Sequence, residues 1–398
     1  MDADLVVIGA GALGLSTALH AALAGRSVVV VDRDRAGSQA SGRAAALFKS
    51  VQADALRTEL ARRSIARAIS FADWAGAELA TVRSGSLLIA RTDEHKAYLM
   101  TEARQSKSWG VDVRKANTDR PSYYQGDGSE FALWCPEDIY IEEPNDLVQA
   151  YVTACRLHGA ELLEHERVVA ITTSAGRIAG VETTNRTIAA TAVVDAAGAW
   201  TRQLAELAGA DVAVAPVRHQ LLITAPTTDV DPADPITRVV DAAVYLRPAR
   251  GGLMMGGFEA DPLPVDPRTE PSEFDTDDLA LDLGVLRKLA GQVEAEVPQA
   301  LTGLVAEHRG GLFTMSPDGR FVAGPVPDVP GLWVAAGCNG SGFSSSLALG
   351  EALAGWICDR QAESHIDALS PARFGAFTDD ALVSAGAWQY AHFYDPAG

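Results

Sequence analysis

The sequence predicts an α/β protein whose N-terminal part is a parallel sheet flanked by helices. Three observations lead to this prediction: an apolar run from Leu5 to Ile8, a glycine-rich turn directly after it, and a second apolar run from Val28 to Val31 that ends at Asp32. A buried strand, a turn, a helix and a second buried strand form a βαβ unit. An acidic residue at the tip of the second strand is typical of units that bind a dinucleotide.

Each part of the glycine turn has a physical task. Gly9 permits the tight turn, Gly11 lets a pyrophosphate approach the backbone, and Gly14 lets the next helix pack against the sheet. That helix, expected from about Gly11 to Ala24, points its positive end at the phosphates. Asp32 can accept hydrogen bonds from a ribose diol. The unit therefore predicts a bound adenine dinucleotide.

Composition limits the classes of partner. The 398 residues are enough for two domains or lobes, and the net charge of −19 argues against nucleic acid or an anionic membrane surface as partner. No apolar run reaches about 18 residues, and the acidic start, Met1 to Asp4, differs from a signal peptide. We therefore expect a cytoplasmic protein without a membrane partner. The four cysteines form no CxxC pair, so they suggest neither a metal site nor a disulfide framework.

Three further segments bear on which dinucleotide is bound. Residues 33–46 are small and hydroxyl-rich, as needed to pass close to an extended cofactor, although a surface loop is the alternative. Residues 192–200 form a buried strand that ends in a small-residue turn. Residues 331–343 form a strand and a glycine turn before a helix from about Ser345 to Cys358. Amide groups in such a late turn can meet the polar edge of a flavin ring, which favours FAD over a nicotinamide cofactor.

Motifs along nearly the whole chain carry a resemblance. They are GAGALG with Asp32, Ser38 to Leu47, VVDAAGAW, PVRHQLLIT, YLRPARGGLMMGGFE, GGLFTMSPDGRFVAGP and GLWVAAGCNGSGFSSSLALGEALAGWI. Together they resemble the D-amino-acid oxidase and glycine/sarcosine oxidase superfamily of FAD amine oxidoreductases. Within it they are most similar to the flavin portion of dimethylglycine and sarcosine dehydrogenases. Tyr390 to Pro396 resembles the point where those longer enzymes enter a folate-binding half, and we expect no folate domain here.

The resemblance implies a domain organisation. A discontinuous Rossmann-like FAD-binding domain would comprise residues 1–80, 140–215 and 305–360. A substrate-binding domain with a mixed or antiparallel sheet would comprise residues 81–139 and 216–304, and residues 361–398 would form a C-terminal tail packing on the FAD domain. Independently, the apolar runs from Ser84 to Ile89 and from Tyr245 to Phe258 predict strands. Residues 162–171 are expected to form one strand, and residues 178–184 and 187–190 alternate like the strands of a hairpin.

The glycine turns and the resemblance together predict the residues that bind FAD. They are Gly9, Gly11, Ala12, Leu13, Gly14, Asp32, Arg33, Ser41, Gly42, Arg43, Ala44, Ala45, Val168, Ala197, Gly198, Trp200, Gly311, Gly337, Asn339, Gly340, Ser341, Gly342 and Phe343. Relatives that attach FAD covalently use a histidine near the position of Arg43 or a cysteine near that of Gly311. Because neither nucleophile is present, we expect a non-covalent flavin, with Arg43 available to its phosphates or ring.

Oxidation of an amine by a flavin requires a group beside the amine and an anchor for a carboxylate. The resemblance implies that His219 and Tyr245 lie in the active site, where they would flank the amine and tune its protonation; packing residues are the alternative. Arg247, two residues after Tyr245, faces the same side of a strand and could hold a carboxylate, unless it forms an ordinary salt bridge. Arg309 is a second candidate for this anchor.

Two lysines of monomeric sarcosine oxidase are missing. The lysine that promotes the reaction with oxygen aligns with Met254, and the one that binds the substrate carboxylate aligns with Ser344. Without a positive charge beside the ring, reoxidation by oxygen should be slower. This favours a dehydrogenase that uses an electron carrier, or a slow oxidase, and puts sarcosine itself in doubt as the substrate.

We therefore expect an FAD-dependent oxidoreductase that oxidises the C–N bond of a secondary or tertiary amine of the N-methyl or N-alkyl amino acid type. Hydride transfer to the flavin would leave an imine that water hydrolyses, with oxygen or a carrier as the final acceptor. One alternative is a D-amino-acid or glycine oxidase or dehydrogenase acting on a primary amine. Another is a flavin-carrying subunit of a multi-protein dehydrogenase. The oligomeric state stays open.

Overall fold

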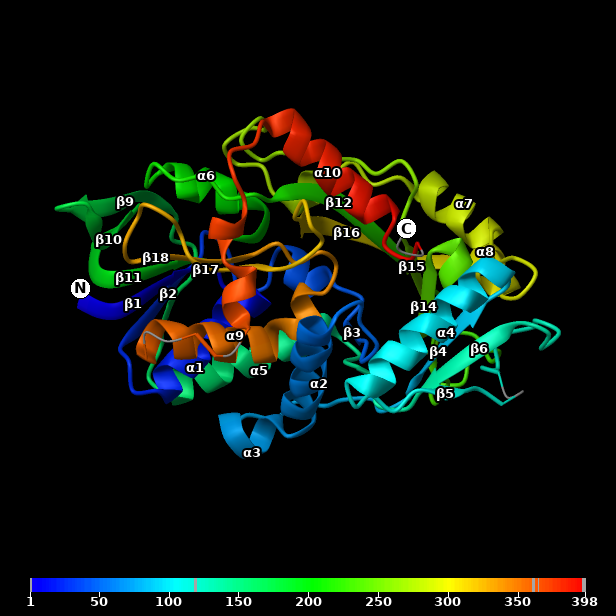
Figure 1. Cartoon of the computed structure of the whole chain (residues 1–398). Helices are drawn as coiled ribbons and strands as arrows, with labels where there is room; N and C mark the ends of the chain where they lie inside the picture. The colour runs from blue at the N-terminus through cyan, green and yellow to red at the C-terminus, as the bar shows by residue number, and fades with distance from the viewer. Residues whose placement is uncertain (1, 118–119, 360–361, 364, 396–398) are drawn as a thin grey trace.

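Two large sheets lie side by side in the computed structural model, which describes residues 2–117, 120–359, 362–363 and 365–395 (Figure 1). The first sheet has the order β17-β18-β11-β1-β2-β8, and β10 and β9 continue it from β11. Its strands are β1 (Asp2–Ile8), β2 (Val28–Val31), β8 (Glu161–Leu163), β9 (Val168–Ser174), β10 (Arg177–Thr183), β11 (Thr187–Asp195), β17 (Val322–Pro325) and β18 (Leu332–Ala336).

The centre of the first sheet is the βαβ unit predicted from the sequence. β1 pairs in parallel with β2 and with β11, so that Val7 lies between Val30 and Val194. These strands are continuous apolar runs because helices cover one face of the sheet and further apolar side chains cover the other. The connecting helix α1 spans Ala12–Leu23. The predicted start and end of this unit are confirmed to within a residue or two.

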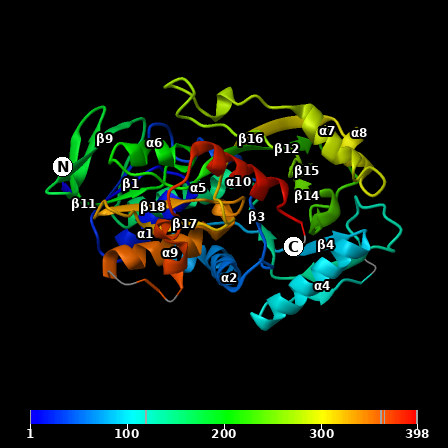
Figure 2. The ribbon, with the colours of Figure 1, turned by 45° about the horizontal axis from the view of Figure 1, so that its top comes forward.

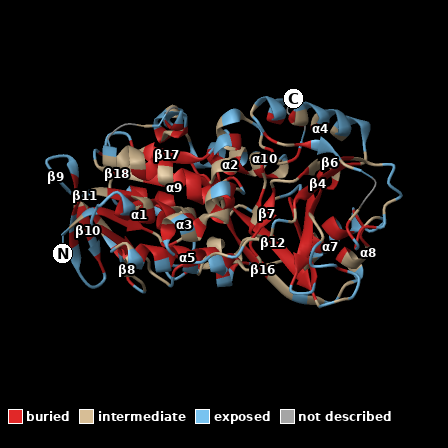
Figure 3. Cartoon of the chain, turned by 90° about the horizontal axis from the view of Figure 1, so that it is seen from below, coloured by how far each residue is buried: buried red, intermediate tan, exposed pale blue. Residues whose placement is uncertain are grey.

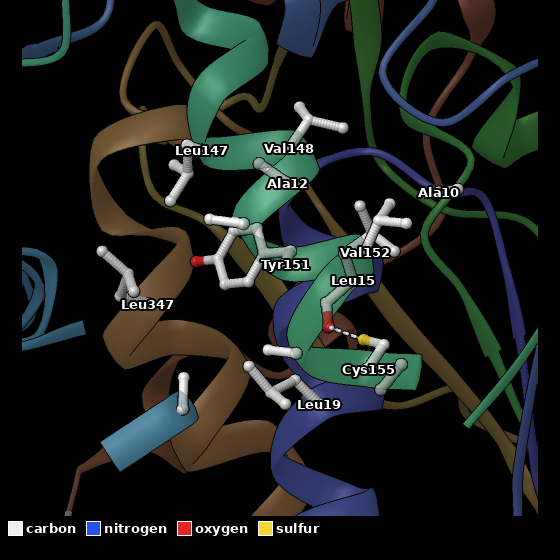
Figure 4. Close-up of a cluster of buried hydrophobic side chains, with 14 of the residues drawn as sticks. Ala10, Ala12, Leu15, Leu19, Leu147, Val148, Tyr151, Val152, Cys155 and Leu347 are labelled. Carbon is white, nitrogen blue, oxygen red and sulfur yellow. Dashed lines mark hydrogen bonds between the residues drawn. The ribbon is translucent and has the colours of Figure 1, made fainter. Parts of the chain in front are cut away.

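Helix α1 packs between α5 (Pro144–Leu157) and α9 (Gly342–Asp359) (Figure 4). Leu15 of α1 and Tyr151 of α5 belong to one buried apolar cluster, and the Cys155 thiol donates to the Leu15 carbonyl at 3.5 Å. The Tyr151 hydroxyl forms a 2.9 Å hydrogen bond with Ser346 of α9. These contacts fix α1, and therefore the glycine turn before it, on the sheet.

The second sheet is mostly antiparallel and has the order β16-β12-β15-β14-β13-β4-β6-β5. Its strands are β4 (Ser86–Ala90), β5 (Arg114–Lys115), β6 (Phe131–Cys135), β12 (Ala215–Thr224), β13 (Ile236–Val239), β14 (Val244–Ala249), β15 (Gly252–Gly257) and β16 (Val305–Met315). Among these strands the β13–β4 pair is parallel. A small ladder of β3 (Leu47–Phe48) and β7 (Ile139–Tyr140) lies in the chain segments that connect the sheets.

The remaining helices cover the outside of the two sheets, where exposed residues gather in Figure 3. They are α2 (Ala55–Ile69), α3 (Phe71–Ala75), α4 (Asp93–Ser108), α6 (Thr201–Glu206), α7 (Leu283–Gly291), α8 (Pro298–Thr302) and α10 (Asp379–Ala391). Figures 1 and 2 both show α10 lying along β12 and β16, far in sequence from both strands. None of the described helices is long and apolar enough to cross a membrane.

Three details differ from the sequence expectations. The apolar stretch around residues 162–171 is not one strand, because His165 takes a left-handed conformation (φ 58°) and separates β8 from β9. The predicted hairpin strand and the buried strand before residue 195 are one continuous strand, β11. Of the expected C-terminal tail, residues 366–373 pack on β17 of the first sheet, but α10 packs on the second sheet.

The division into two domains remains a proposal. One fact refines it: β16, which lies inside the stretch 305–360 assigned to the FAD-binding domain, pairs along its length with β12 and is an edge strand of the second sheet. Its Gly311 nevertheless lies next to Ala40, and both glycines Gly310 and Gly311 line a cavity between the sheets. β16 therefore belongs to the second sheet by hydrogen bonding and contributes to both sides of the site.

Candidate functional site

A cavity of about 1270 Å³ extends from the carboxyl ends of β1, β2, β11 and β18 to the face of the second sheet. It brings together most of the residues that the sequence singled out. Those lining it are Gly9, Gly11, Ala12, Leu13, Asp32, Arg33, Ser41, Arg43, Ala44, Ala45, Val168, Ala197, Gly198, Trp200, His219, Tyr245, Arg309, Gly311, Asn339, Gly340, Ser341, Gly342 and Phe343. Gly14, Gly42, Gly337 and Arg247 are not among the lining residues.

Backbone crowding explains the glycines of the first turn. Gly9 has φ +105°, and a Cβ there would lie 2.5 Å from the carbonyl oxygen of Ala196. A Cβ on Gly14 would collide with the Gly9 carbonyl, so Gly14 shapes the turn from outside the cavity. Gly11 precedes α1 without a side-chain cap, and Ala12 N–H donates to Ser41 Oγ at 3.0 Å. The amide end of α1 is therefore open to the cavity.

Asp32 connects the turn to the end of β2. Its Oδ2 accepts from Ala10 N–H at 2.6 Å, and its Oδ1 accepts from Asp34 N–H at 2.9 Å. Burial raises the pKa of the Asp32 carboxyl to about 6, against the opposing effect of these hydrogen bonds. At neutral pH the group is ionised, and each oxygen keeps a lone pair for a further donor such as a ribose hydroxyl.

The arginines beside the turn differ in their partners. The Arg33 guanidinium lies 4.1 Å from the centroid of the Trp200 ring, so both side chains form one wall of the cavity. Arg43 donates to the Ser38 carbonyl at 3.1 Å and to Asp277 at 2.7 Å. Much of the donor capacity of Arg43 is thus used by protein, and its expected role at the phosphates or ring stays a prediction.

His219 lies at the centre of a chain of hydrogen bonds on β12. Its Nε2 is 2.9 Å from the hydroxyl of Tyr245, and its Nδ1 is 2.7 Å from the hydroxyl of Tyr390. The ring stacks on Phe313 with a centroid separation of 4.2 Å. Burial lowers the pKa of His219 to about 3, so the imidazole is neutral over the working range of most enzymes.

A glycine allows Tyr245 to reach His219. The two residues lie on β14 and β12, which are separated by β15, and Tyr245 is paired with Gly256 of that strand. A Cβ on Gly256 would overlap the Tyr245 hydroxyl. The tyrosine ring therefore lies across Gly256 and reaches the imidazole two strands away.

Tyr390 was not predicted from the sequence as a site residue. It comes from α10, 171 residues after its partner, and it begins the sequence segment Tyr390 to Pro396 that resembles the point where longer enzymes enter a folate-binding half. The one available signal was the density of aromatic residues in that run. Phe393 and Tyr394 also line the cavity, and Phe393 stacks on Phe258 with a centroid separation of 4.0 Å.

The structure does not bring Arg247 to the cavity, unlike the other residues predicted to hold the substrate. Its side chain is completely buried and does not line the cavity. The guanidinium donates to the carbonyls of Ala45 (3.2 Å), Pro248 (2.7 Å) and Glu142 (2.9 Å), and to the Glu142 carboxylate (3.2 Å). Because these acceptors occupy its donors, Arg247 is a structural residue that ties β14 to the segments before and after β3 and β7.

Arg309 has the properties expected of a carboxylate anchor. It lines the cavity and is only 9% exposed. Within the described residues, neither its Nε nor its Nη2 has a hydrogen-bond partner. Glu307 lies 3.4 Å from Nε without a hydrogen bond, and burial lowers the pKa of Arg309. A buried guanidinium with unused donors is costly unless a ligand satisfies them.

Two further cations line the cavity and were not predicted. Lys49 is half-buried, with its Nζ 5.8 Å from the Tyr394 ring centroid. Arg238 of β13 is paired with Tyr245 across the sheet and donates to Asp138 at 3.2 Å. Neither residue lies in a recognisable motif. The register of the second sheet brings Arg238 to the cavity, and Lys49 follows directly after β3.

Comparison with known proteins connects this geometry to a family. Residues 4–356 match the family model described as "DAO: FAD dependent oxidoreductase". The chain is 26% identical to a 4-methylaminobutanoate oxidase (formaldehyde-forming) of Paenarthrobacter nicotinovorans over 88% of its length and 43% of the relative's. It is 27% identical to mitochondrial sarcosine dehydrogenase of Homo sapiens over 94% of its length and 41% of the relative's. The chain thus spans less than half of the length of these curated relatives.

A solved structure with the same fold is L-proline dehydrogenase from P. horikoshii. The TM-score is 0.84 at 22% sequence identity, and the similarity covers 94% of this chain and 98% of that one. This likeness confirms the predicted fold class, a parallel α/β sheet joined to a second, mostly antiparallel sheet.

Proposed function

The chain belongs to the FAD-dependent oxidoreductase family, and we propose that it oxidises the C–N bond of a secondary or tertiary amine of the N-methyl or N-alkyl amino acid type. The observation that carries the proposal is the neutral His219–Tyr245 pair in the cavity wall, on the same sheet face as Arg309, whose Nε and Nη2 make no hydrogen bond among the described residues. The names of two relatives specify a methylamino acid and sarcosine, which is N-methylglycine. Both names support an N-methylated substrate.

The residues at the first-sheet end of the cavity fit FAD. The turn at Gly9 and Gly11 leaves no room for side chains, the amide end of α1 is open, and Asp32 retains lone pairs for a diol. On the opposite side, Gly311 gives the cavity a wall without a side chain, close to Ala40. Bound FAD would supply the acceptor for a hydride that leaves the carbon next to the amine nitrogen.

The second sheet supplies the groups that would hold the amine. His219, Tyr245, Phe258 and Phe313 form a largely apolar wall, which favours the neutral amine over the ammonium because burial penalises charge. A neutral amine is the form that can release a hydride from its neighbouring carbon. Arg309 would bind the carboxylate through Nε and Nη2 and thereby orient the C–H bond.

The acceptor and the attachment of the cofactor are also proposals. Met254 is fully buried and does not line the cavity, whereas Ser344 lines it, so neither position offers a cation beside the site. We propose reoxidation by an electron carrier, or slowly by oxygen, and a flavin held without a covalent bond. Imine hydrolysis by water would complete the turnover and release an aldehyde, which is formaldehyde when the oxidised carbon is a methyl group.

An anaerobic screen tests the proposal. The FAD-loaded protein is mixed with matched pairs of N-methyl and primary amino acids, and bleaching of the flavin is followed at roughly 450 nm. We expect N-methyl or N-alkyl amino acids to bleach the flavin at least about tenfold faster than their primary counterparts. After reoxidation, formaldehyde should appear in the product.

Other results of the same screen point to the alternatives. Bleaching by primary amines alone, with release of ammonia, would indicate a D-amino-acid or glycine oxidase and overturn the proposal. A yellow protein that no amine bleaches without a second protein would indicate a flavin-carrying subunit of a larger dehydrogenase.

A further inference from the structure

The hydrogen bond between Tyr390 and His219 joins the C-terminal helix to the cavity wall. Tyr390 lies beyond the residues 4–356 that match the family model, so this contact comes from outside the shared region. Its hydroxyl is buried and is not part of the cavity lining, which means that it reaches a ligand only through His219. Tyr390 is thus placed to act on the site indirectly.

The helix that carries Tyr390 is anchored at several points. Leu382 packs in an apolar cluster with Ala213 and Ala215, and Gly386 lies so close to Ala215 that an added Cβ would be 2.9 Å from the alanine Cβ. Beyond the helix, Phe393 stacks on Phe258. These contacts on both sides of Tyr390 hold its hydroxyl at the imidazole.

The direction of the hydrogen bonds follows from counting donors. A neutral imidazole has one N–H, so one of its two tyrosine partners donates and the other accepts. The Tyr390 side chain is buried and does not line the cavity, so its O–H needs an acceptor within the protein. Among the described residues His219 Nδ1, at 2.7 Å, is that acceptor. A buried O–H without an acceptor would cost about 1–3 kcal/mol.

The rest of the chain of hydrogen bonds is then determined. With Nδ1 accepting from Tyr390, the single N–H of His219 is on Nε2 and donates to the Tyr245 oxygen at 2.9 Å. The O–H of Tyr245 is consequently not used by His219. Because Tyr245 lines the cavity, this O–H is available to a ligand.

We propose that Tyr390 is a positioning residue that holds His219 in its Nε2–H tautomer and so presents the Tyr245 hydroxyl to the cavity as a hydrogen-bond donor. Without Tyr390, the imidazole proton can move to Nδ1, and Nε2 then accepts from Tyr245 instead. In that state Tyr245 offers the cavity an acceptor. The tautomer does not depend on the reaction, and only its kinetic consequence rests on the function proposed above.

Histidine NMR tests the tautomer without any substrate. The full-length protein is labelled with ¹⁵N-histidine, and the His219 signals are assigned by their loss in His219→Gln. We expect the wild-type ring to show the Nε2–H pattern and the ring of Tyr390→Phe to shift to the Nδ1–H or averaged pattern. Tyr123→Phe is the matched control, because its buried hydroxyl binds Pro235 and Thr237 away from the cavity.

Kinetics supply the second measurement. With an amine that bleaches the flavin, Tyr390→Phe should lower kcat by about tenfold while FAD stays bound, and Tyr123→Phe should leave kcat within about twofold. A wild-type His219 in the Nδ1–H form, or an unchanged tautomer in Tyr390→Phe, overturns the proposal. If Tyr390→Phe does not fold, the wild-type spectrum alone still shows whether His219 is in the Nε2–H tautomer. An inactive protein with the expected spectra would refute the proposed function and leave the tautomer assignment intact.

Discussion

Two arginines of the second sheet, Arg247 on β14 and Arg309 on β16, show what decides the role of a buried cation. Arg247 and Arg309 are both almost inaccessible to water, so burial alone does not distinguish them. Arg247 donates to several protein acceptors, whereas Nε and Nη2 of Arg309 make no hydrogen bond with any described residue. A guanidinium whose N–H donors all have protein acceptors stabilises the fold. One with unused donors next to a cavity can bind a ligand through them.

This contrast makes a prediction for matched variants. Arg309→Gln should raise KM for a carboxylate-bearing amine about 10- to 100-fold, since a hydrogen bond to a charged group contributes about 1.5–3 kcal/mol. Arg247→Gln should instead lower the free energy of unfolding by about 2–4 kcal/mol, with KM of the surviving protein little changed. Steady-state kinetics and denaturant unfolding of both variants check this. An unchanged KM in Arg309→Gln would remove it as the anchor.

The same pair shows the limit of sequence reasoning at this scale. Period-two spacing placed Arg247 on the face of Tyr245, and nothing local showed that Ala45 and Glu142, more than 100 residues earlier, supply its acceptors. His219 and Tyr245 could be named because family motifs contain them. Tyr390 and Lys49 could not, because their positions depend on how distant elements pack.

At the scale of elements, the register of the second sheet creates the His219 site. One row across the sheet pairs Arg309 with Leu221, Leu221 with Gly256, Gly256 with Tyr245, and Tyr245 with Arg238. Residues paired in this way share a face, so the row carries the two arginines and the tyrosine to the same cavity. Because Gly256 has no side chain, the Tyr245 ring can lie across its position in this row.

A side chain at position 256 should break the hydrogen bond between Tyr245 and His219. Gly256→Ala places a methyl group where the Tyr245 hydroxyl lies, so the tyrosine must turn away and its hydrogen bond to His219 is lost. We expect kcat/KM for amines to fall at least about tenfold and stability to fall by about 1–3 kcal/mol.

The control for this variant is Gly355→Ala. Gly355 lies in α9 with open space at its Cβ position, and alanine there should stabilise the helix by about 0.5–1 kcal/mol without a kinetic effect. Rapid-mixing measurement of flavin reduction, with thermal unfolding of the same samples, separates the two outcomes. A Gly256→Ala protein that reduces its flavin at the wild-type rate would contradict the account of Tyr245.

Elements with a strong local pattern were predictable. The βαβ unit, the late strand with its glycine turn, and the hairpin strands appear where apolar periodicity and glycines placed them. The break between β8 and β9 was not visible, because His165 adopts its positive φ through a backbone hydrogen bond to Asp34, a partner distant in sequence. The join of the two parts of β11 escaped prediction for a similar reason, since both pair within one sheet.

At the scale of the whole molecule, the cavity is where the two sheets face each other. Its lining comes from both, and direct bridges such as the Arg43–Asp277 ion pair, whose carboxylate is exposed, contribute little to holding them together. A cofactor that fills the cavity would therefore stabilise both sheets together, by an amount that depends on its concentration.

This leads to a prediction on cofactor release. Acid precipitation should leave the yellow colour in the supernatant, and the colourless protein should unfold at lower temperature than the loaded one. FAD at about 100 times its Kd should add about 2.7 kcal/mol of stability, measured by calorimetry. Colour retained in the precipitate would show a covalent bond and contradict the expectation drawn from Arg43 and Gly311.

The long separation between His219 and Tyr390 also matters for biosynthesis. A ribosome delivers β12 and β16 well before α10, so the imidazole and the apolar face around it emerge without the helix that covers them. For that interval the nascent chain exposes Phe258 and Phe313. Chaperone capture should accordingly rise once residue 315 has left the exit tunnel and cease when α10 packs on β12 and β16.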